Sequence, residues 1–240
     1  MLTHYTLLLL LAAADATPVP APRTAADIVE RMVAADNRRL ADLSGYTGTR
    51  RYRFENKRIN KRAEMTVRIA CNSSGTKTFE VVSEDGPTVV RNRILRKMME
   101  AETQASQAGE KQQTRIIPQN YSFRLLGTKN LNGRESYVLE ISPLTKNKFL
   151  IRGRIWVDAE DFAVSRVEGT PAQNPSFWIR SVQVTQRYER VGRFWLPAAN
   201  DSRAEARIFG TTEVSIEYFD YVTSDRTEQA RSDNGRESSQ

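Results

Sequence analysis

Residues Phe149–Gly169, FLIRGRIWVDAEDFAVSRVEG, predict two strands joined by the turn AEDF. The pattern continues through SFWIRSVQVTQRYER, FWLPAAN and RAEARIFG to TTEVSIEYFDYV, which ends at Val222. In the last of these segments Thr212, Val214, Ile216 and Tyr218 alternate with polar residues. Alternation with a period of two predicts strands with one buried face and one solvated face. A long antiparallel meander of this kind needs a sheet, a helix or an apolar ligand against its buried face.

The preceding part of the chain predicts two helices and more strands. Apolar residues at helical spacing predict one helix from near Ala25 to near Leu43 and a basic helix from Pro87 to about Ala108. Asn132-Gly133 is a strong signal for a two-residue hairpin. The count of about ten or eleven strands predicts a mainly β (α+β) fold, because so long a sheet curls into a half-open barrel or a strongly curved sheet. We expect two or more helices to cover its concave side.

The two ends of the chain are expected to lie outside this domain. Residues 1–16 end in Ala14-Asp15-Ala16 after a short apolar block, which is typical of a cleaved signal peptide and too short for a membrane span. The alternative is an uncleaved apolar segment. Residues 17–24 predict a flexible lead, residues 25–222 form the domain, and residues 223–240 lack large apolar side chains, which predicts a disordered tail. No cysteine comes directly after the apolar block, so we expect no lipid anchor.

Histidine and cysteine usage restricts the chemistry. His4 is the only histidine among 240 residues, and cleavage of the signal peptide removes it. The mature chain then has no imidazole for a catalytic triad or for a metal site. Cys71, the only cysteine, lies in phase with Met65, Val67 and Ile69, which favours a buried, inert thiol. We therefore expect no enzyme activity, no catalytic residues, no cofactor and no metal.

Two motifs carry a family resemblance. GRIWVDAEDFAVSRVEG (Gly153–Gly169) and GRFWLPAANDSRAE (Gly192–Glu205) resemble the exported outer-membrane lipoprotein-sorting family, which groups LolA, LolB and their relatives. The resemblance implies a half-open β-barrel with helices over an apolar cavity, in a periplasmic protein. In the best-known members the cavity holds lipoprotein acyl chains, whereas relatives bind other lipids or a peptide partner. The long basic helix and the formal net charge of +7 depart from the best-known carriers.

A carrier cavity needs apolar side chains on the inner face of the sheet, since acyl burial contributes about 0.8 kcal/mol per CH₂. For each candidate the favoured alternative is an ordinary core contact between sheet and helix. Trp156 is in phase with Arg152 and Arg154, which indicates a surface aromatic or a residue at a partner-facing or cavity-rim site. The cavity candidates are Tyr52, Phe54, Met65, Val67, Phe79, Val81, Leu139, Ile141, Trp156, Phe177, Trp178 and Tyr218.

Basic clusters suggest further partners. Arg50-Arg51-Arg53, Lys57-Arg58 with Lys61-Arg62, and Arg91 to Lys97 are either solvated faces or contacts for an anionic membrane surface or an acidic protein. No nucleic-acid motif is present. The sequence thus predicts a monomeric, exported carrier of lipid or lipoprotein acyl chains that serves lipoprotein sorting or lipid transfer to the outer membrane. The alternative is an envelope signalling or scaffold protein of the same fold that binds a peptide or protein.

Overall fold

The computed structural model describes residues 24–105, 112–174, 179–208 and 210–226. Its helical elements are α1 (Ala25–Asp42), α2 (Thr88–Val90), the π-helical turn η1 (Arg91–Leu95) and α3 (Arg96–Ala105). Its strands are β1 (Leu43–Asn56), β2 (Lys61–Cys71), β3 (Lys77–Asp85), β4 (Tyr121–Leu131), β5 (Arg134–Pro143), β6 (Ile151–Asp158), β7 (Val164–Pro171), β8 (Ile179–Val191), β9 (Phe194–Ala206) and β10 (Gly210–Asp225).

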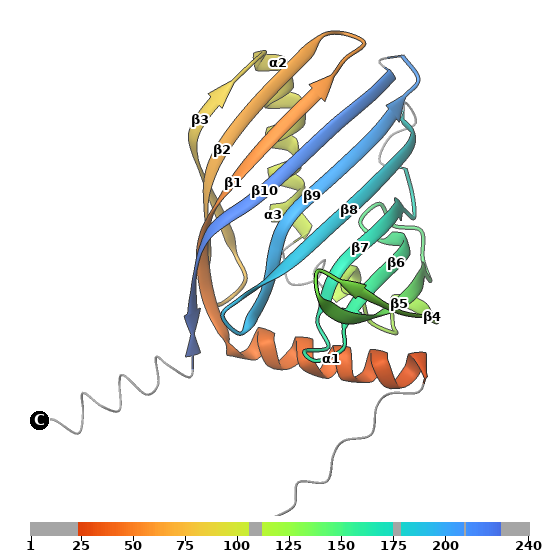
Figure 1. The fold of residues 1–240 in the computed structure, drawn as a ribbon. Helices are drawn as coiled ribbons and strands as arrows, with labels where there is room; N and C mark the ends of the chain where they lie inside the picture. The colour runs from red at the N-terminus through yellow and green to blue at the C-terminus, as the bar shows by residue number, and fades with distance from the viewer. Residues whose placement is uncertain (1–23, 106–111, 175–178, 209, 227–240) are drawn as a thin grey trace, which may run out of the picture.

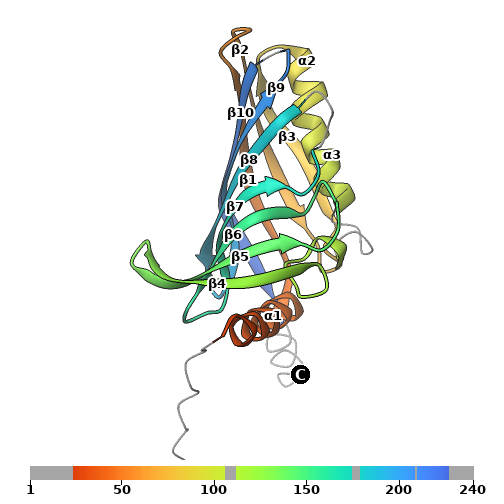
Figure 2. The ribbon, with the colours of Figure 1, turned by 90° about the vertical axis from the view of Figure 1, so that its right-hand side faces the viewer.

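All ten strands form one antiparallel sheet that stays open. Their order is β3-β2-β1-β10-β9-β8-β7-β6-β5-β4, so β3 and β4 are its two edges. Figures 1 and 2 show that the sheet twists and curls into a half-barrel. The predicted mainly β, half-open architecture is therefore confirmed. The one pairing between distant segments joins β1 to β10, where Tyr52 stands opposite Ile216.

Local sequence explains the turns and the close strand contacts. Asn132 and Gly133 have φ values of 53° and 83°, as a two-residue hairpin with positive φ requires. Gly153 and Gly169 stand opposite each other in β6 and β7. A Cβ atom on Gly153 would lie 1.9 Å from the carbonyl oxygen of Glu168, so this strand pair needs glycine there.

Two separate helical covers lie on the concave side. α1 crosses one end of the sheet, while α2, η1 and α3 run along the face formed by β1, β2 and β3 (Figures 1 and 2). α1 begins with a capping box in which Thr24 and Asp27 bond each other's backbone amides. The helices predicted near Ala25 and after Pro87 are therefore present.

Each cover has its own core. Beneath α1, the buried residues Ile28, Val29, Met32, Tyr121, Leu139, Ile141, Leu150, Ile155, Val157 and Val167 pack together. Beneath α2 and α3, the second cluster consists of Tyr52, Phe54, Ala63, Met65, Val67, Val90, Leu95, Met99 and Ile216. α1 and α3 are both amphipathic, and each packs its apolar side onto a different part of the curved sheet. The region between the two covers belongs to neither of these clusters.

The structure differs from the sequence expectations at several points. Trp156 is buried, because it lies between its strand neighbours Val138 and Arg166, whose guanidinium carbon is 5.3 Å from the indole centroid. Cys71 is half-buried rather than a sealed core residue, because it ends β2 at a turn. β10 continues to Asp225, three residues beyond the expected domain end at 222.

Candidate functional site

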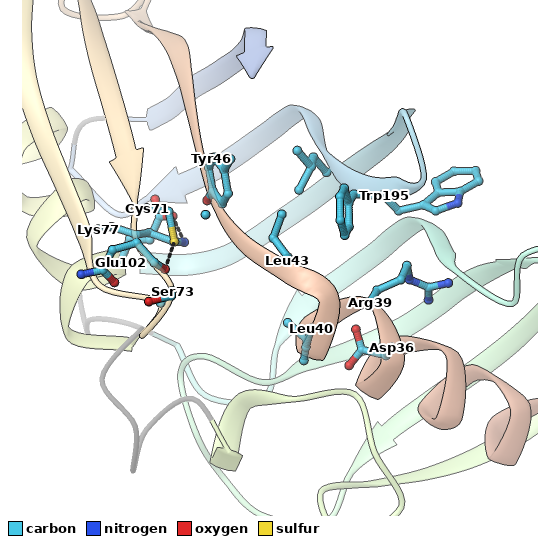
Figure 3. Close-up of a pocket in the computed structure, with 15 residues that line it drawn as sticks. Asp36, Arg39, Leu40, Leu43, Tyr46, Cys71, Ser73, Lys77, Glu102 and Trp195 are labelled. Atoms are coloured by element: carbon cyan, nitrogen blue, oxygen red, sulfur yellow. Dashed lines mark hydrogen bonds and ion pairs between the residues drawn. The ribbon is translucent and has the colours of Figure 1, made fainter. Parts of the chain in front are cut away.

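A cavity of about 340 Å³ lies on the concave side between the two helical covers. The C-terminal part of α1, the start of β1, the turn after β2, α3 and the start of β9 all contribute to it (Figure 3). The size is at the lower end of the range for small-ligand sites, about 300–1,000 Å³. Its apolar walls come from Leu40, Leu43, Tyr46, Phe194 and Leu196, and its polar walls from Asp36, Arg39, Asn72, Ser73, Lys77, Glu102 and Trp195.

Alternation along β9 explains one apolar wall. Phe194 and Leu196 are buried at this cavity, while Trp195 between them lies where it meets the neighbouring cavity and donates its indole N–H to Asp161 Oδ2 at 2.9 Å. The opposite wall comes from the last turn of α1, where Leu40 remains 40% exposed. An exposed leucine at the mouth of a cavity leaves apolar surface for a ligand to cover.

Close backbone packing shapes the remaining wall. A Cβ atom on Gly45 would lie 2.6 Å from the carbonyl oxygen of Cys71, so β1 and the end of β2 pack more closely than any larger residue allows. The turn that follows is held by Asn72, whose side-chain oxygen accepts hydrogen bonds from the backbone amides of Ser74 and Thr76. This turn places Lys77, the first residue of β3, at the cavity.

A buried ion-pair cluster lies at the end of the cavity beneath α3. Arg50 of β1 is 1% exposed and holds Glu102 of α3 through two hydrogen bonds of 2.5 and 3.0 Å. Lys77 Nζ donates to the same carboxylate at 2.6 Å. The Arg50 guanidinium also lies 5.4 Å from the ring centroid of Phe79 and 4.8 Å from that of Tyr218. The cluster therefore ties a helix and two strands together at one point.

The pKa values follow from this arrangement. Burial alone would raise the pKa of Glu102, but the charges and hydrogen bonds of Arg50 and Lys77 lower it from 4.5 to about 2. Burial works to lower the pKa of Arg50, and Glu102 outweighs it, so that pKa is raised. Burial also raises the pKa of Tyr46 at the cavity wall and of Tyr218 beneath Arg50. Arg50 and Glu102 are thus both ionised near neutral pH, and these tyrosines are neutral.

A second cavity of about 330 Å³ adjoins the first and shares Asp36, Arg39 and Trp195 with it. It extends between α1 and the strands β7 and β8, where Met32, Ile116 and Tyr188 line it. A shallower groove of about 620 Å³ runs on the outer side of α1 beside β4, with Ala34 and Phe123 among its residues. These three hollows border α1, whereas two others lie elsewhere: one of about 390 Å³ on β1, β8, β9 and β10, and one of about 410 Å³ beside α3.

The predicted cavity residues are placed mostly beneath the covers. Tyr52, Phe54, Met65 and Val67 belong to the core under α2 and α3, with Phe79 and Tyr218 packed against it. Leu139 and Ile141 belong to the core under α1, Trp156 is buried, and Val81 is 36% exposed on an edge strand. Phe177 and Trp178 lie outside the described residues. None of the ten described candidates lines the cavity between the covers, and their contact with a ligand stays a prediction.

Sequence reasoning missed the charged residues of the site. Arg50 was grouped with Arg51 and Arg53 as a basic cluster, yet only the last two point outward, where they pair with Glu64 and Glu217. Arg50 is in phase with Tyr52 and Phe54, so the period of two already placed it on the inner face. Lys77 and Glu102 belong to no sequence motif, so no pattern identifies them as residues of this site.

Within the described residues, no helix combines the length and the apolar character that crossing a membrane requires. No group of three or more His, Cys, Asp or Glu residues in that part of the chain is arranged to hold a metal ion.

Comparison with known proteins bears on the fold. Residues 118–225 match a family of unknown function, DUF5686, and no curated protein matches. A DUF1329 family structure from Desulfovibrio piger shares 12% identity over 84% of this chain and 94% of that chain, with a TM-score of 0.42. A LolA superfamily structure from Nitrosomonas europaea shares 14% over 85% and 95%, with a TM-score of 0.36. The MucA/MucB complex of Pseudomonas aeruginosa shares 12% over 80% and 92%, with a TM-score of 0.26.

With TM-scores of 0.26–0.42 and identities of 12–14%, these likenesses carry no information about which ligand or partner this chain binds.

Proposed function

We propose that this protein is an exported, non-catalytic carrier that binds the acyl chain of a lipid or lipoprotein in the cavity between its two helical covers. The observation that carries the proposal is the cavity itself. It is about 340 Å³, its apolar walls come from α1, β1 and β9, and Leu40 at its mouth is 40% exposed. An alkyl chain placed there gains about 0.8 kcal/mol for each buried CH₂.

The proposal includes the cellular route expected from the sequence. Residues 1–16 would be removed on export, and the mature protein would act in the periplasm in lipoprotein sorting or lipid transfer to the outer membrane. The buried aromatic and aliphatic residues predicted from the sequence would then hold the walls in place beneath the covers. Amino-terminal sequencing of the purified protein tests the cleavage after Ala16.

The test of binding uses paired variants on one helix. The full chain is purified from producing cells, and its bound lipid is extracted and measured by mass spectrometry. Leu40→Trp fills the mouth of the cavity, so we expect at least tenfold less co-purified lipid than in the unchanged protein. Ala34→Trp adds the same ring on the outer side of α1 and should leave the lipid content unchanged. Lipid-free unchanged protein, or equal lipid in both variants, contradicts the proposal.

A second candidate function is the binding of a peptide or protein partner in envelope signalling. One observation favours it, because β3 is an open edge on which Val82 is 54% exposed. An extended peptide can add a strand to such an edge through backbone hydrogen bonds. Val82→Pro would block that addition without touching the cavity. If the Val82→Pro variant no longer bound a partner that the unchanged protein binds, and if its lipid content stayed the same, this second function would be favoured.

A further inference from the structure

The charges at the α3 end of the cavity do not cancel. Arg50 and Lys77 bring two positive charges to the single carboxylate of Glu102. Arg50 is fully buried, and Lys77 and Glu102 are 21% and 30% exposed. An excess positive charge next to an apolar, partly enclosed space costs free energy unless an anion compensates it. The cavity therefore favours a negatively charged group at this end.

Arg50 is committed to Glu102, which leaves Lys77 as the available cation at the α3 end of the cavity. The guanidinium holds the carboxylate with two hydrogen bonds, donates to the Tyr52 hydroxyl at 3.3 Å and lies against two aromatic rings. These contacts fix it in one position. An ammonium group has three donors, and in the described part of the chain Lys77 uses one of them, toward Glu102. Two donors of Lys77 therefore remain for a ligand at the cavity.

The polar side chains of the opposite wall have other hydrogen-bond partners. Asp36 accepts a hydrogen bond from Arg115 at 2.6 Å. Arg39 donates to the carbonyl oxygens of Asp161 and Phe162 at 2.9 and 3.3 Å. Beside these two polar side chains the α1 wall presents Leu40, and Figure 3 shows Lys77 and Glu102 on one side of the space with Leu40 and Leu43 on the other. The site therefore joins a cationic end at Lys77 to an apolar surface formed by Leu40, Leu43 and Leu196.

We propose that Lys77 binds the carboxylate head of a single-chain alkyl carboxylate whose chain lies along Leu40, Leu43 and Leu196. This inference rests on the proposed function and adds the ligand class. The cavity volume favours one chain over a multi-chain lipid, since it is near the lower limit for ligand sites. Arg50 and Glu102 keep their pair, so binding requires no movement of α3.

The experiment compares three ligands that share one chain: dodecanoate, its methyl ester and dodecyl phosphate. Their dissociation constants are measured on the full chain by displacement of a fluorescent alkyl probe. We expect dodecanoate to bind about tenfold more tightly than the ester, because a charge-assisted hydrogen bond forms only with the carboxylate. Lys77→Met should reduce dodecanoate to the affinity of the ester and leave the ester unchanged. Lys77→Arg should keep the preference.

A matched control is Lys97→Met, which removes an exposed lysine of α3 that pairs with Glu100. It should leave all three affinities unchanged. Equal affinity of ester and dodecanoate for the unchanged protein overturns the carboxylate site while the proposed carrier function stands. A tenfold preference for dodecyl phosphate over dodecanoate overturns the choice of carboxylate. Absence of binding by all three ligands instead refutes the proposed function itself.

Discussion

The two helical covers hold the same sheet by different means. α1 packs through Ile28, Val29 and Met32 onto apolar residues of β4 to β7. The cover formed by α2 and α3 also has an apolar core, but it adds a buried ion pair between Arg50 and Glu102. Apolar packing is non-directional and proportional to buried area, whereas an ion pair fixes one geometry and must overcome the desolvation of its charges.

Because of this difference, we expect the stability of the fold to depend on charge mainly on the α3 side. On the α1 side, loss of one side chain removes contacts in proportion to its size. On the α3 side, loss of the Glu102 charge leaves the buried Arg50 guanidinium without a carboxylate, which costs more than the pair itself contributes. The cavity lies between the two, with apolar walls from one side and charged residues from the other.

The largest effect is expected for Arg50→Ala. The substitution leaves Glu102 without its bidentate partner and opens space between Phe79 and Tyr218. We expect the free energy of unfolding to fall by about 4 kcal/mol, measured by urea denaturation. Arg53→Ala is the control, because Arg53 is an outward neighbour on the same strand, 45% exposed, and should cost less than about 1 kcal/mol. Equal losses in the two variants would remove the proposed difference between the covers.

The second largest effect is expected in the pH dependence of stability, through Glu102. The pKa of Glu102 is lowered from 4.5 to about 2 in the folded protein, so its stabilisation is present above pH 4.5 and is lost as the pH falls toward 2. The expected loss from this group is up to about 3 kcal/mol. Glu102→Gln should be less stable near neutral pH and show a flatter profile between pH 5 and 2. Glu100→Gln, on the exposed side of the same helix, should keep the original profile.

On the α1 side, Val157→Ala should act without regard to pH. Val157 is fully buried in the core beneath α1, and removal of two methyl groups costs about 2 kcal/mol from lost burial and the resulting cavity. Thermal or urea unfolding at pH 7 and at pH 5 should give the same loss. Val222→Ala, at a site that is 66% exposed, should cost less than about 0.5 kcal/mol. A loss for Val157→Ala that changes with pH would show that charge also matters on this side.

Much of the fold could be predicted from local sequence. Alternation between Phe149 and Val222 predicts strands because one face of the sheet is dry, and Asn132-Gly133 predicts its hairpin because both residues tolerate positive φ. The helix start at Ala25 follows from the cap formed by Thr24. The pairing of β1 with β10 could not be predicted, since it joins distant segments and depends on the curvature of the whole sheet.

The site was harder to predict than the fold. Apolar residues of the inner face were proposed as cavity lining, but most lie beneath a helix, and which of them a helix covers depends on tertiary packing. For Arg50 the sequence contains a usable signal, because it is in phase with Tyr52 and so lies on the inner face of its strand. For Glu102 the sequence contains no such signal, because it is one of several polar residues on a predicted helix. Leu40 lies on the apolar stripe of α1, and its exposure follows only from where the sheet ends.

The smallest expected effect concerns the end of α1. Thr24 accepts a hydrogen bond from the backbone amide of Asp27 at 3.2 Å, and Asp27 accepts one from the amide of Thr24 at 3.1 Å. Thr24→Ala should lower the free energy of unfolding by about 1 kcal/mol, as loss of a cap does. Thr24→Ser keeps the hydroxyl and should restore most of that loss. If Thr24→Ala instead lowered the free energy of unfolding as much as Arg50→Ala does, then α1 would be held mainly by its cap. The proposed contrast between an apolar cover and a charge-dependent cover would then be wrong.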